Sequence, residues 1–164
     1  NVLPIMAYSL SKTYTLYGTR CGAMICIAKT KEIADEFKRV CEYSSRGSWS
    51  NSAKVAQVIL SRIYGEPGLL ERVDKERAHY REMLIKRGRA FEEEAKKVGL
   101  KIVPFDAGFF ISIPCSDPDA ISAKLEKEGV FIVPLAKGLR VSVASISEDK
   151  CRKLPAIIKA AMEE

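Results

Sequence analysis

The stretch between Pro67 and Gly99 constrains the fold of this chain more than any other feature of its sequence. Proline favours the first turn of a helix, and glycine favours the position just past its end. A helix from Pro67 to Val98 would be about 48 Å long at 1.5 Å per residue. Since that exceeds the diameter of a small domain, we expect the helix to connect two lobes. Apolar residues spaced by three, four and seven line one face of it: Leu70, Val73, Tyr80, Leu84, Phe91, Ala95 and Val98.

The composition indicates an ordinary globular protein. With 164 residues, 47% of them hydrophobic, the chain can form one good core or two small lobes. No apolar run approaches the length needed to cross a bilayer. The net charge is +6, but basic and acidic residues alternate, as in residues 71–77, which is typical of solvated helix faces. We therefore expect neither nucleic acid nor a membrane as a partner.

The cysteines and the single histidine argue against metal chemistry. His79 lies among charged residues of a helical stretch, where we expect it at the surface. Histidine-based catalytic triads and zinc sites are therefore not predicted. An odd number of cysteines without a secretion signal predicts reduced thiols and a cytoplasmic protein. The five cysteines show no C-x-x-C pair and no metal-ligand spacing: Cys21, Cys26, Cys41, Cys115 and Cys151.

The remaining segments predict an α/β fold. Residues 22–28 form a continuous apolar run, which is typical of a strand buried on both faces. Thr30 is a suitable N-cap for a helix to about Tyr43, and residues 44–50 have the composition of a loop. Further strands are predicted at 4–9, near 100–103, and at 109–113, 130–133 and 139–144. Further helices are predicted from Asn51 or Ser52 to about Tyr64, at 117–128 and at 147–162.

The chemistry of the chain is concentrated near its start. Ser9-Leu10-Ser11-Lys12 is followed, after seven residues, by Arg20-Cys21-Gly22. A lysine amine can condense with an aldehyde to form a Schiff base. Hydroxyl groups and a planar guanidinium suit a phosphate, because both donate hydrogen bonds to its oxygens. This set of side chains is therefore suited to binding pyridoxal 5'-phosphate: Ser9, Ser11, Lys12 and Arg20.

Residues 9–22, Ser-Leu-Ser-Lys-Thr-Tyr-Thr-Leu-Tyr-Gly-Thr-Arg-Cys-Gly, resemble the lysine motif of the class I/II aminotransferases. These are the aspartate aminotransferase-like, fold type I enzymes that use pyridoxal 5'-phosphate (PLP). The resemblance implies that Lys12 is the Schiff-base lysine and also moves a proton as a general base. It implies that Ser9 and Arg20 bind the cofactor phosphate. Ser11 stands at a position that is often a hydroxyl residue in the family.

The order of the predicted elements matches the C-terminal portion of this family. Residues 1–66 would be the C-terminal piece of the large PLP-binding domain. Residues 67–98 would be the long connecting helix, and residues 99–164 the small α/β domain.

Arg140 stands in an otherwise apolar strand segment, residues 138–144. A buried arginine without a partner is costly, so a carboxylate should meet it. One possibility is a structural ion pair with an acidic residue of the protein. The resemblance implies instead that Arg140 is the small-domain arginine that binds the α-carboxylate of the amino acid substrate.

Residues 46–51, Arg-Gly-Ser-Trp-Ser-Asn, resemble a loop of the dicarboxylate-specific members of the family. In those members an arginine of this loop enters the active site of the partner subunit. Arg46 would pair there with the side-chain carboxylate of aspartate or glutamate. Ser50 and Asn51 match positions at the dimer interface, where the serine approaches the neighbour's cofactor phosphate. A homodimer is therefore implied.

The same segment also allows other interpretations. Gly47-Ser48 departs from the commonest form of the loop, and Arg46 would then be an exposed loop residue. Trp49, with the pair Phe109-Phe110, could line a pocket for aromatic side chains, although core packing explains the phenylalanines equally well. The tyrosines near the lysine receive no role.

The predicted function is transamination between a dicarboxylic or aromatic amino acid and a 2-oxo acid. In the family, the groups that hold the cofactor ring lie many tens of residues before the lysine, whereas only eight residues precede Ser9. We therefore expect a C-terminal portion of an enzyme, inactive by itself. Two alternatives stay open. One is a PLP-dependent C–S lyase or decarboxylase of the same fold, and the other is a non-catalytic, effector-sensing domain of a transcription regulator.

Overall fold

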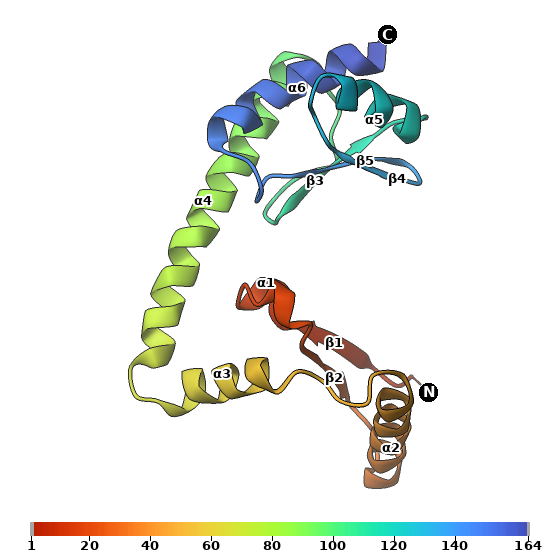
Figure 1. Cartoon of the computed structure of the whole chain (residues 1–164), viewed down its shortest axis with the longest axis vertical. Coiled ribbons are helices and arrows are strands. Elements are labelled where there is room, and N and C mark those ends of the chain that lie inside the picture. The colour runs from red at the N-terminus through yellow and green to blue at the C-terminus, as the bar shows by residue number, and fades with distance from the viewer. Residues whose placement is uncertain (1, 164) are drawn as a thin grey trace. The chain divides into compact units, whose positions relative to one another are not determined.

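The computed structural model describes residues 2–163, which form two compact units (Figure 1). The first unit ends at Arg77 and the second begins at Ala78. The long helix predicted from the periodicity is confirmed as α4 (Leu69–Lys97), and the division between the units falls within it. The domain boundaries expected after residues 66 and 98 stay predictions. None of the described helices is long and apolar enough to cross a membrane.

The first unit contains a two-stranded sheet and three longer helical segments (Figure 1). Its strands are antiparallel and pair from Ile5 opposite Cys26 to Ser9 opposite Gly22. Between them the chain forms two short helical turns. The elements are β1 (Ile5–Ser9), α1 (Leu10–Thr13), the 3-10 helix η1 (Tyr17–Thr19), β2 (Gly22–Cys26), α2 (Lys31–Ser48), α3 (Lys54–Gly65) and the start of α4.

The core of the first unit is built around the segment that carries the lysine. Leu69, Leu70 and Val73 from the first turns of α4 pack against this core. The α1 segment is therefore held by side chains that come from helices later in the chain. The buried members of the core are Leu10, Tyr14, Cys21, Ala56 and Ile63.

The two predicted strands of the first unit are confirmed in place, but their expected burial is wrong. Met6 of β1 is 53% exposed, and Met24 of β2 is 60% exposed. The reason is that β1 and β2 pair only with each other within the described residues, and α2 buries none of its side chains. An apolar run of residues indicates that burial is favourable. A strand is buried only if another helix or sheet packs against its face.

The predicted loop at residues 44–50 is also wrong, because α2 continues to Ser48. Its Thr30 N-cap is confirmed, since the Thr30 side chain accepts a hydrogen bond from the Ile33 amide. The amides of Trp49 and Ser50 both donate to the carbonyl of Ser45, at 2.9 and 3.1 Å. These bonds extend the helix through residues whose intrinsic propensity favours a loop. As a result, α3 begins at Lys54, later than predicted.

The second unit is a small α/β layer formed by a three-stranded antiparallel sheet in the order β3-β5-β4, with helices packed on it (Figure 1). The predicted α/β fold class is confirmed. The later half of α4 supplies Phe91 and Ala95 to its core. The elements are β3 (Phe110–Pro114), α5 (Pro118–Lys127), β4 (Val133–Leu135), β5 (Gly138–Ser142) and α6 (Glu148–Glu163).

Two predicted strands of this unit differ from the structure, and each follows a helix that ends in a glycine cap. After α4, Gly99 adopts a φ of +68°, and the Leu100 amide donates to the Ala95 carbonyl at 2.8 Å. The described residues between Lys97 and Phe110 form no strand. After α5, Gly129 adopts a φ of +72° and the Val130 amide donates to the Leu125 carbonyl, and β4 begins at Val133 rather than at residue 130.

We expect Gly88→Ala to destabilise the second unit. Gly88 lies inside α4, and an added Cβ would meet the buried ring of Phe105. The clash should cost about 1–3 kcal/mol, more than the gain in helix propensity of about 1 kcal/mol. Gly47→Ala is the matched control, because Gly47 is also helical and has open space around it. The urea midpoint should fall for Gly88→Ala and should not fall for Gly47→Ala. A stabilised Gly88→Ala protein would contradict the packing.

Candidate functional site

The pairing of β1 with β2 brings the two ends of the lysine motif together. The Leu10 amide donates to the Cys21 carbonyl at 3.2 Å, directly beyond the paired residues Ser9 and Gly22. Ser9 is the N-cap of α1, and its Oγ accepts a hydrogen bond from the Ser11 amide at 3.2 Å. A serine hydroxyl used in this way keeps its own O–H as a donor. Ser9 is thus equipped to bind an anion at the start of α1.

Lys12 and Arg20 lie over the same aromatic ring. The Lys12 Nζ is 4.6 Å from the centroid of the Tyr17 ring, and the Arg20 Cζ is 5.1 Å from it. Both side chains are exposed, and Arg20 also donates from Nη1 to the Tyr17 carbonyl at 3.3 Å. Because guanidinium carries five donors, this contact leaves Arg20 able to bind a phosphate. The structure therefore brings an amine and a guanidinium to one place.

The backbone of Arg20 has an unusual conformation. Its φ is +50°, in the left-handed region that favours glycine, and it caps η1. For other residues this conformation costs about 1–2 kcal/mol. Thr15, also between the lysine and the arginine, has a φ of +55°. Strained residues of this kind are often retained where a side chain is needed for function.

Tyr14 is buried two residues after the lysine and is joined to two other elements. Its hydroxyl is hydrogen-bonded to the hydroxyl of Tyr64 at 2.6 Å, and its ring lies 5.0 Å from the Arg77 guanidinium carbon. The hydrogen bond with Tyr64 and burial raise the pKa of Tyr14 to about 12, with smaller contributions from the Tyr64 and Tyr8 phenols. The Arg77 charge acts in the opposite direction and lowers this pKa.

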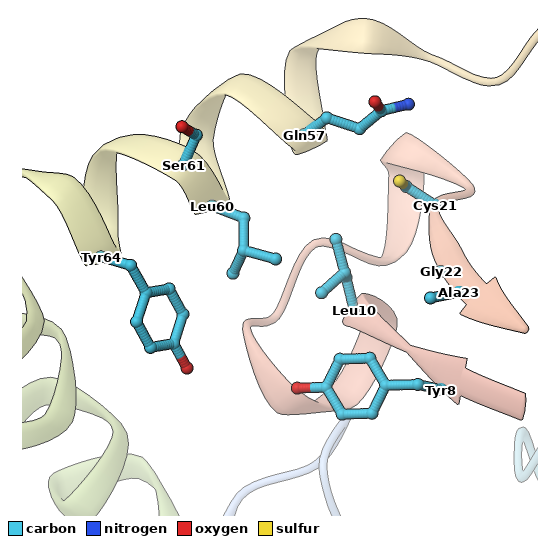
Figure 2. Close-up of a pocket in the computed structure, with 9 residues that line it drawn as sticks. All are labelled: Tyr8, Leu10, Cys21, Gly22, Ala23, Gln57, Leu60, Ser61 and Tyr64. Carbon is cyan, nitrogen blue, oxygen red and sulfur yellow. The ribbon is translucent and has the colours of Figure 1, made fainter. Parts of the chain in front are cut away.

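A cavity of about 610 Å³ lies between the lysine motif and α3 (Figure 2). Figure 2 shows Tyr64 extending from α3 on one side and Tyr8 extending from β1 on the other. Neither Lys12 nor Arg20 lines this cavity, so it is separate from the cluster around Tyr17. Its walls are mainly apolar. They are formed by Tyr8, Leu10, Cys21, Gly22, Ala23, Gln57, Leu60, Ser61 and Tyr64.

Arg140, in the second unit, is held in the middle of its sheet. It stands on β5 opposite Ser112 of β3 and Val133 of β4, and its Cζ lies 4.6 Å from the centroid of the Phe110 ring. Its Nε is buried without a hydrogen-bond partner. Within residues 2–163, Arg140 forms no ion pair, so the structural ion pair considered from the sequence is not found. The guanidinium is therefore suited to an anion from outside the described residues.

Arg46 and Ser50, predicted together from the loop motif, are in contact. Arg46 lies in the last turn of α2 rather than in a loop, and its Nη1 donates to Ser50 Oγ at 2.6 Å. Ser50 has a φ of +68°, and the Asn51 side chain accepts from the Ser52 amide at 3.0 Å. Trp49 between them is 80% exposed. The role of these residues in a partner subunit stays a prediction.

Sequence reasoning missed the aromatic residues that hold the cations. Tyr17 and Tyr14 were given no role, and Phe110 was considered only as a pocket or core residue. The placement of Tyr17 between Lys12 and Arg20 in the sequence was an available signal, since a ring there can reach both. For Phe110 the signal appears only in the register, which places it two residues from the partner of Arg140 on β3.

The described residues contain no group of three or more histidine, cysteine, aspartate or glutamate side chains placed to hold a metal ion. The five cysteines are unpaired, and His79 is exposed.

Residues 3–158 match the family described as "Aminotransferase class I and II". The match spans most of the chain, so this chain belongs to the class I and II aminotransferase family. The resemblance inferred from the lysine motif is confirmed at this level. Among curated proteins, an aromatic amino acid aminotransferase of Cutibacterium acnes is 28% identical over 146 residues, which are 88% of this chain and 37% of the relative.

The solved structures agree with the fold. An aminotransferase of Anaerococcus prevotii is 35% identical, with a TM-score of 0.91 over 100% of this chain and 40% of its own. An aromatic-amino-acid aminotransferase of Burkholderia pseudomallei, solved with covalently bound pyridoxal phosphate, has a TM-score of 0.70 at 22% identity. It is matched over 96% of this chain and 40% of its own length. The chain thus spans about two fifths of the length of the relatives that it matches.

The Tyr14–Tyr64 pair predicts a loss of stability at high pH. The native state keeps Tyr14 protonated up to about pH 12, whereas an unfolded phenol ionises near pH 10. This contribution to stability is therefore fully present below about pH 10 and is lost as the pH rises to about 12. In Tyr64→Phe, Tyr14 should ionise at lower pH, as measured by tyrosinate absorbance, and urea unfolding should lose its steep dependence on pH in this range. An unchanged titration would contradict the pair.

Proposed function

We propose that this chain is the C-terminal portion of a PLP-dependent aminotransferase. It would transfer an amino group between an amino acid with a dicarboxylic or aromatic side chain and a 2-oxo acid. The observation that carries the proposal is the joint placement of Lys12 and Arg20 on the Tyr17 ring, in a chain of this family. Because the chain spans about two fifths of its relatives, we propose that it is inactive by itself.

The residues around α1 fit the cofactor. Lys12 supplies an amine that can bond to an aldehyde, and the Ser9 hydroxyl and the Arg20 guanidinium supply donors for a phosphate. Ser11 belongs to the same turn and orients it through its amide contact with Ser9. When bound, PLP supplies an electron sink for the bonds at the substrate's α-carbon. In this proposal the Lys12 amine would also accept and return a proton at that carbon.

Arg140 fits the substrate's α-carboxylate. Its buried Nε lacks a partner within the described residues, and a carboxylate can accept two parallel hydrogen bonds from a guanidinium. Phe110 covers the face of the guanidinium, which leaves the in-plane donors for the ligand. We therefore propose that Arg140 orients the amino acid and the 2-oxo acid alike, because both carry this carboxylate.

The proposed side-chain preference rests on two observations. The aromatic aminotransferase of Cutibacterium acnes supports an aromatic substrate, whereas Arg46 supports a dicarboxylic one. The contact of Arg46 with Ser50, beside an exposed Trp49, supports an interface with a second subunit at this end of α2. We propose a homodimer on this basis. Unpaired cysteines support a reducing compartment such as the cytoplasm.

The decisive test compares Lys12→Ala with Lys29→Ala in the full-length enzyme of which we propose this chain to be a part. Lys29 is a suitable control because it is also exposed. Lys12→Ala should lose the visible absorbance of the bound cofactor and several orders of magnitude of turnover, because no other amine replaces it. Turnover is measured as amino-group exchange between an amino acid and a 2-oxo acid. Unchanged turnover in Lys12→Ala would remove this lysine from the mechanism. Release of ammonia or pyruvate without exchange would instead indicate a lyase.

Arg140→Lys should weaken substrate binding without weakening cofactor binding. Lysine keeps the charge but loses the bidentate geometry, so KM should rise about tenfold or more for both the amino acid and the 2-oxo acid. Cofactor affinity, measured by absorbance titration, should stay the same. The matched control is Arg81→Lys, an exposed arginine of α4. Equal KM values for wild type and Arg140→Lys would contradict the assignment.

A further inference from the structure

The helix that carries the proposed cofactor lysine is too short to be stable without contacts to the rest of the protein. α1 has four residues, Leu10–Thr13, and helices of this length are not stable without tertiary contacts. Of residues 10–16, only Leu10 and Tyr14 are buried, and they lie on either side of Lys12. The position of the lysine therefore depends on what these two residues contact.

Leu10 is anchored by the sheet, because its amide donates to the Cys21 carbonyl at 3.2 Å. Tyr14 forms the second anchor. Its amide donates to the Leu10 carbonyl at 3.2 Å and closes the turn. The next residue, Thr15, has a φ of +55°, so the chain leaves the turn through a conformation with little tolerance for change.

The side chain of Tyr14 joins this turn to both later helices of the first unit. Its hydroxyl pairs with the Tyr64 hydroxyl of α3 at 2.6 Å. Its ring lies 5.0 Å from the guanidinium carbon of Arg77 in α4, which Asp74 holds by an ion pair of 2.7 Å. A part-buried hydrogen bond between two tyrosine hydroxyls restricts both side chains, and the cation over the Tyr14 ring restricts that ring further.

We propose that Tyr14 is a positioning residue for Lys12, and that its contacts with Tyr64 and Arg77 hold the lysine turn in the geometry that reacts with the cofactor aldehyde. This inference rests on the proposed function, because it concerns the reaction of Lys12. Tyr14 does not touch the cofactor in this role. It acts by restricting the turn, so that the amine meets the aldehyde without an additional cost in entropy.

The test uses Tyr14→Phe and Tyr64→Phe in the intact protein, with Tyr43→Phe as the matched control. Each of the first two variants removes the same hydrogen bond from a different side and keeps an aromatic ring, whereas Tyr43 is exposed on α2. Two measurements are made. One is hydrogen exchange of the amides of residues 10–16, and the other is the rate at which added PLP becomes fixed to Lys12 when borohydride is added, followed by mass spectrometry.

We expect faster exchange in residues 10–16 and about fivefold slower fixation for both Tyr14→Phe and Tyr64→Phe. The double variant should be no slower than either single variant, because the bond is lost once. Tyr43→Phe should match wild type, and higher PLP concentrations should restore the final yield in all variants. A merely structural role would lower the urea midpoint without changing the fixation rate.

The outcomes separate the two claims. If wild type fixes PLP at Lys12 and Tyr14→Phe fixes it equally fast, the positioning role is overturned while the proposed function stands. If wild type itself fixes no PLP at Lys12, the proposed function fails and the positioning role fails with it.

Discussion

The site depends first on the pairing of β1 with β2. This pairing places Ser9 opposite Gly22 and lets the Leu10 amide reach the Cys21 carbonyl, so the two ends of the lysine motif meet although they are apart in the sequence. The turns between the strands can then present Lys12 and Arg20 together. If the register slipped by one residue, every side chain of the strand would change faces, and Ser9 would no longer pair with Gly22.

Three arginines of this chain share one kind of contact, a guanidinium lying over an aromatic ring. Arg20, Arg77 and Arg140 each lie over an aromatic ring, with guanidinium carbons 4.6 to 5.1 Å from the ring centroids. The aromatic ring covers the face of the guanidinium. The edge, which carries the N–H donors, stays available to anions. Arg77 uses that edge for Asp74 within the protein. Arg20 and Arg140 retain donors there, which supports the ligand-binding roles that we propose for them.

Particular residues show how far the sequence could predict this structure and site. The periodicity of α4 predicted a helix close to its observed bounds, because one apolar face recurs over many turns. The strand at residues 22–28 was placed correctly but not its exposure, since exposure depends on what covers the hairpin. The end of α2 around Arg46 was wrongly predicted as a loop, because hydrogen bonds to the Ser45 carbonyl outweigh weak local helix propensity there. The contact of Tyr14 with Tyr64 joins residues 50 positions apart, which no local pattern reveals.

The sequence alone determined the family, the α/β class and the residue types for the chemistry, because a lysine between hydroxyls and an arginine at a set distance is a local motif. Only the tertiary structure decided how those residues are held. Rings from Tyr17 and Phe110 meet the cations, Tyr14 reaches α3 and α4, and Arg140 lacks an acidic partner among the described residues. The contacts of Tyr14 and Phe110 join elements distant in the chain, and packing, rather than local preference, selects them.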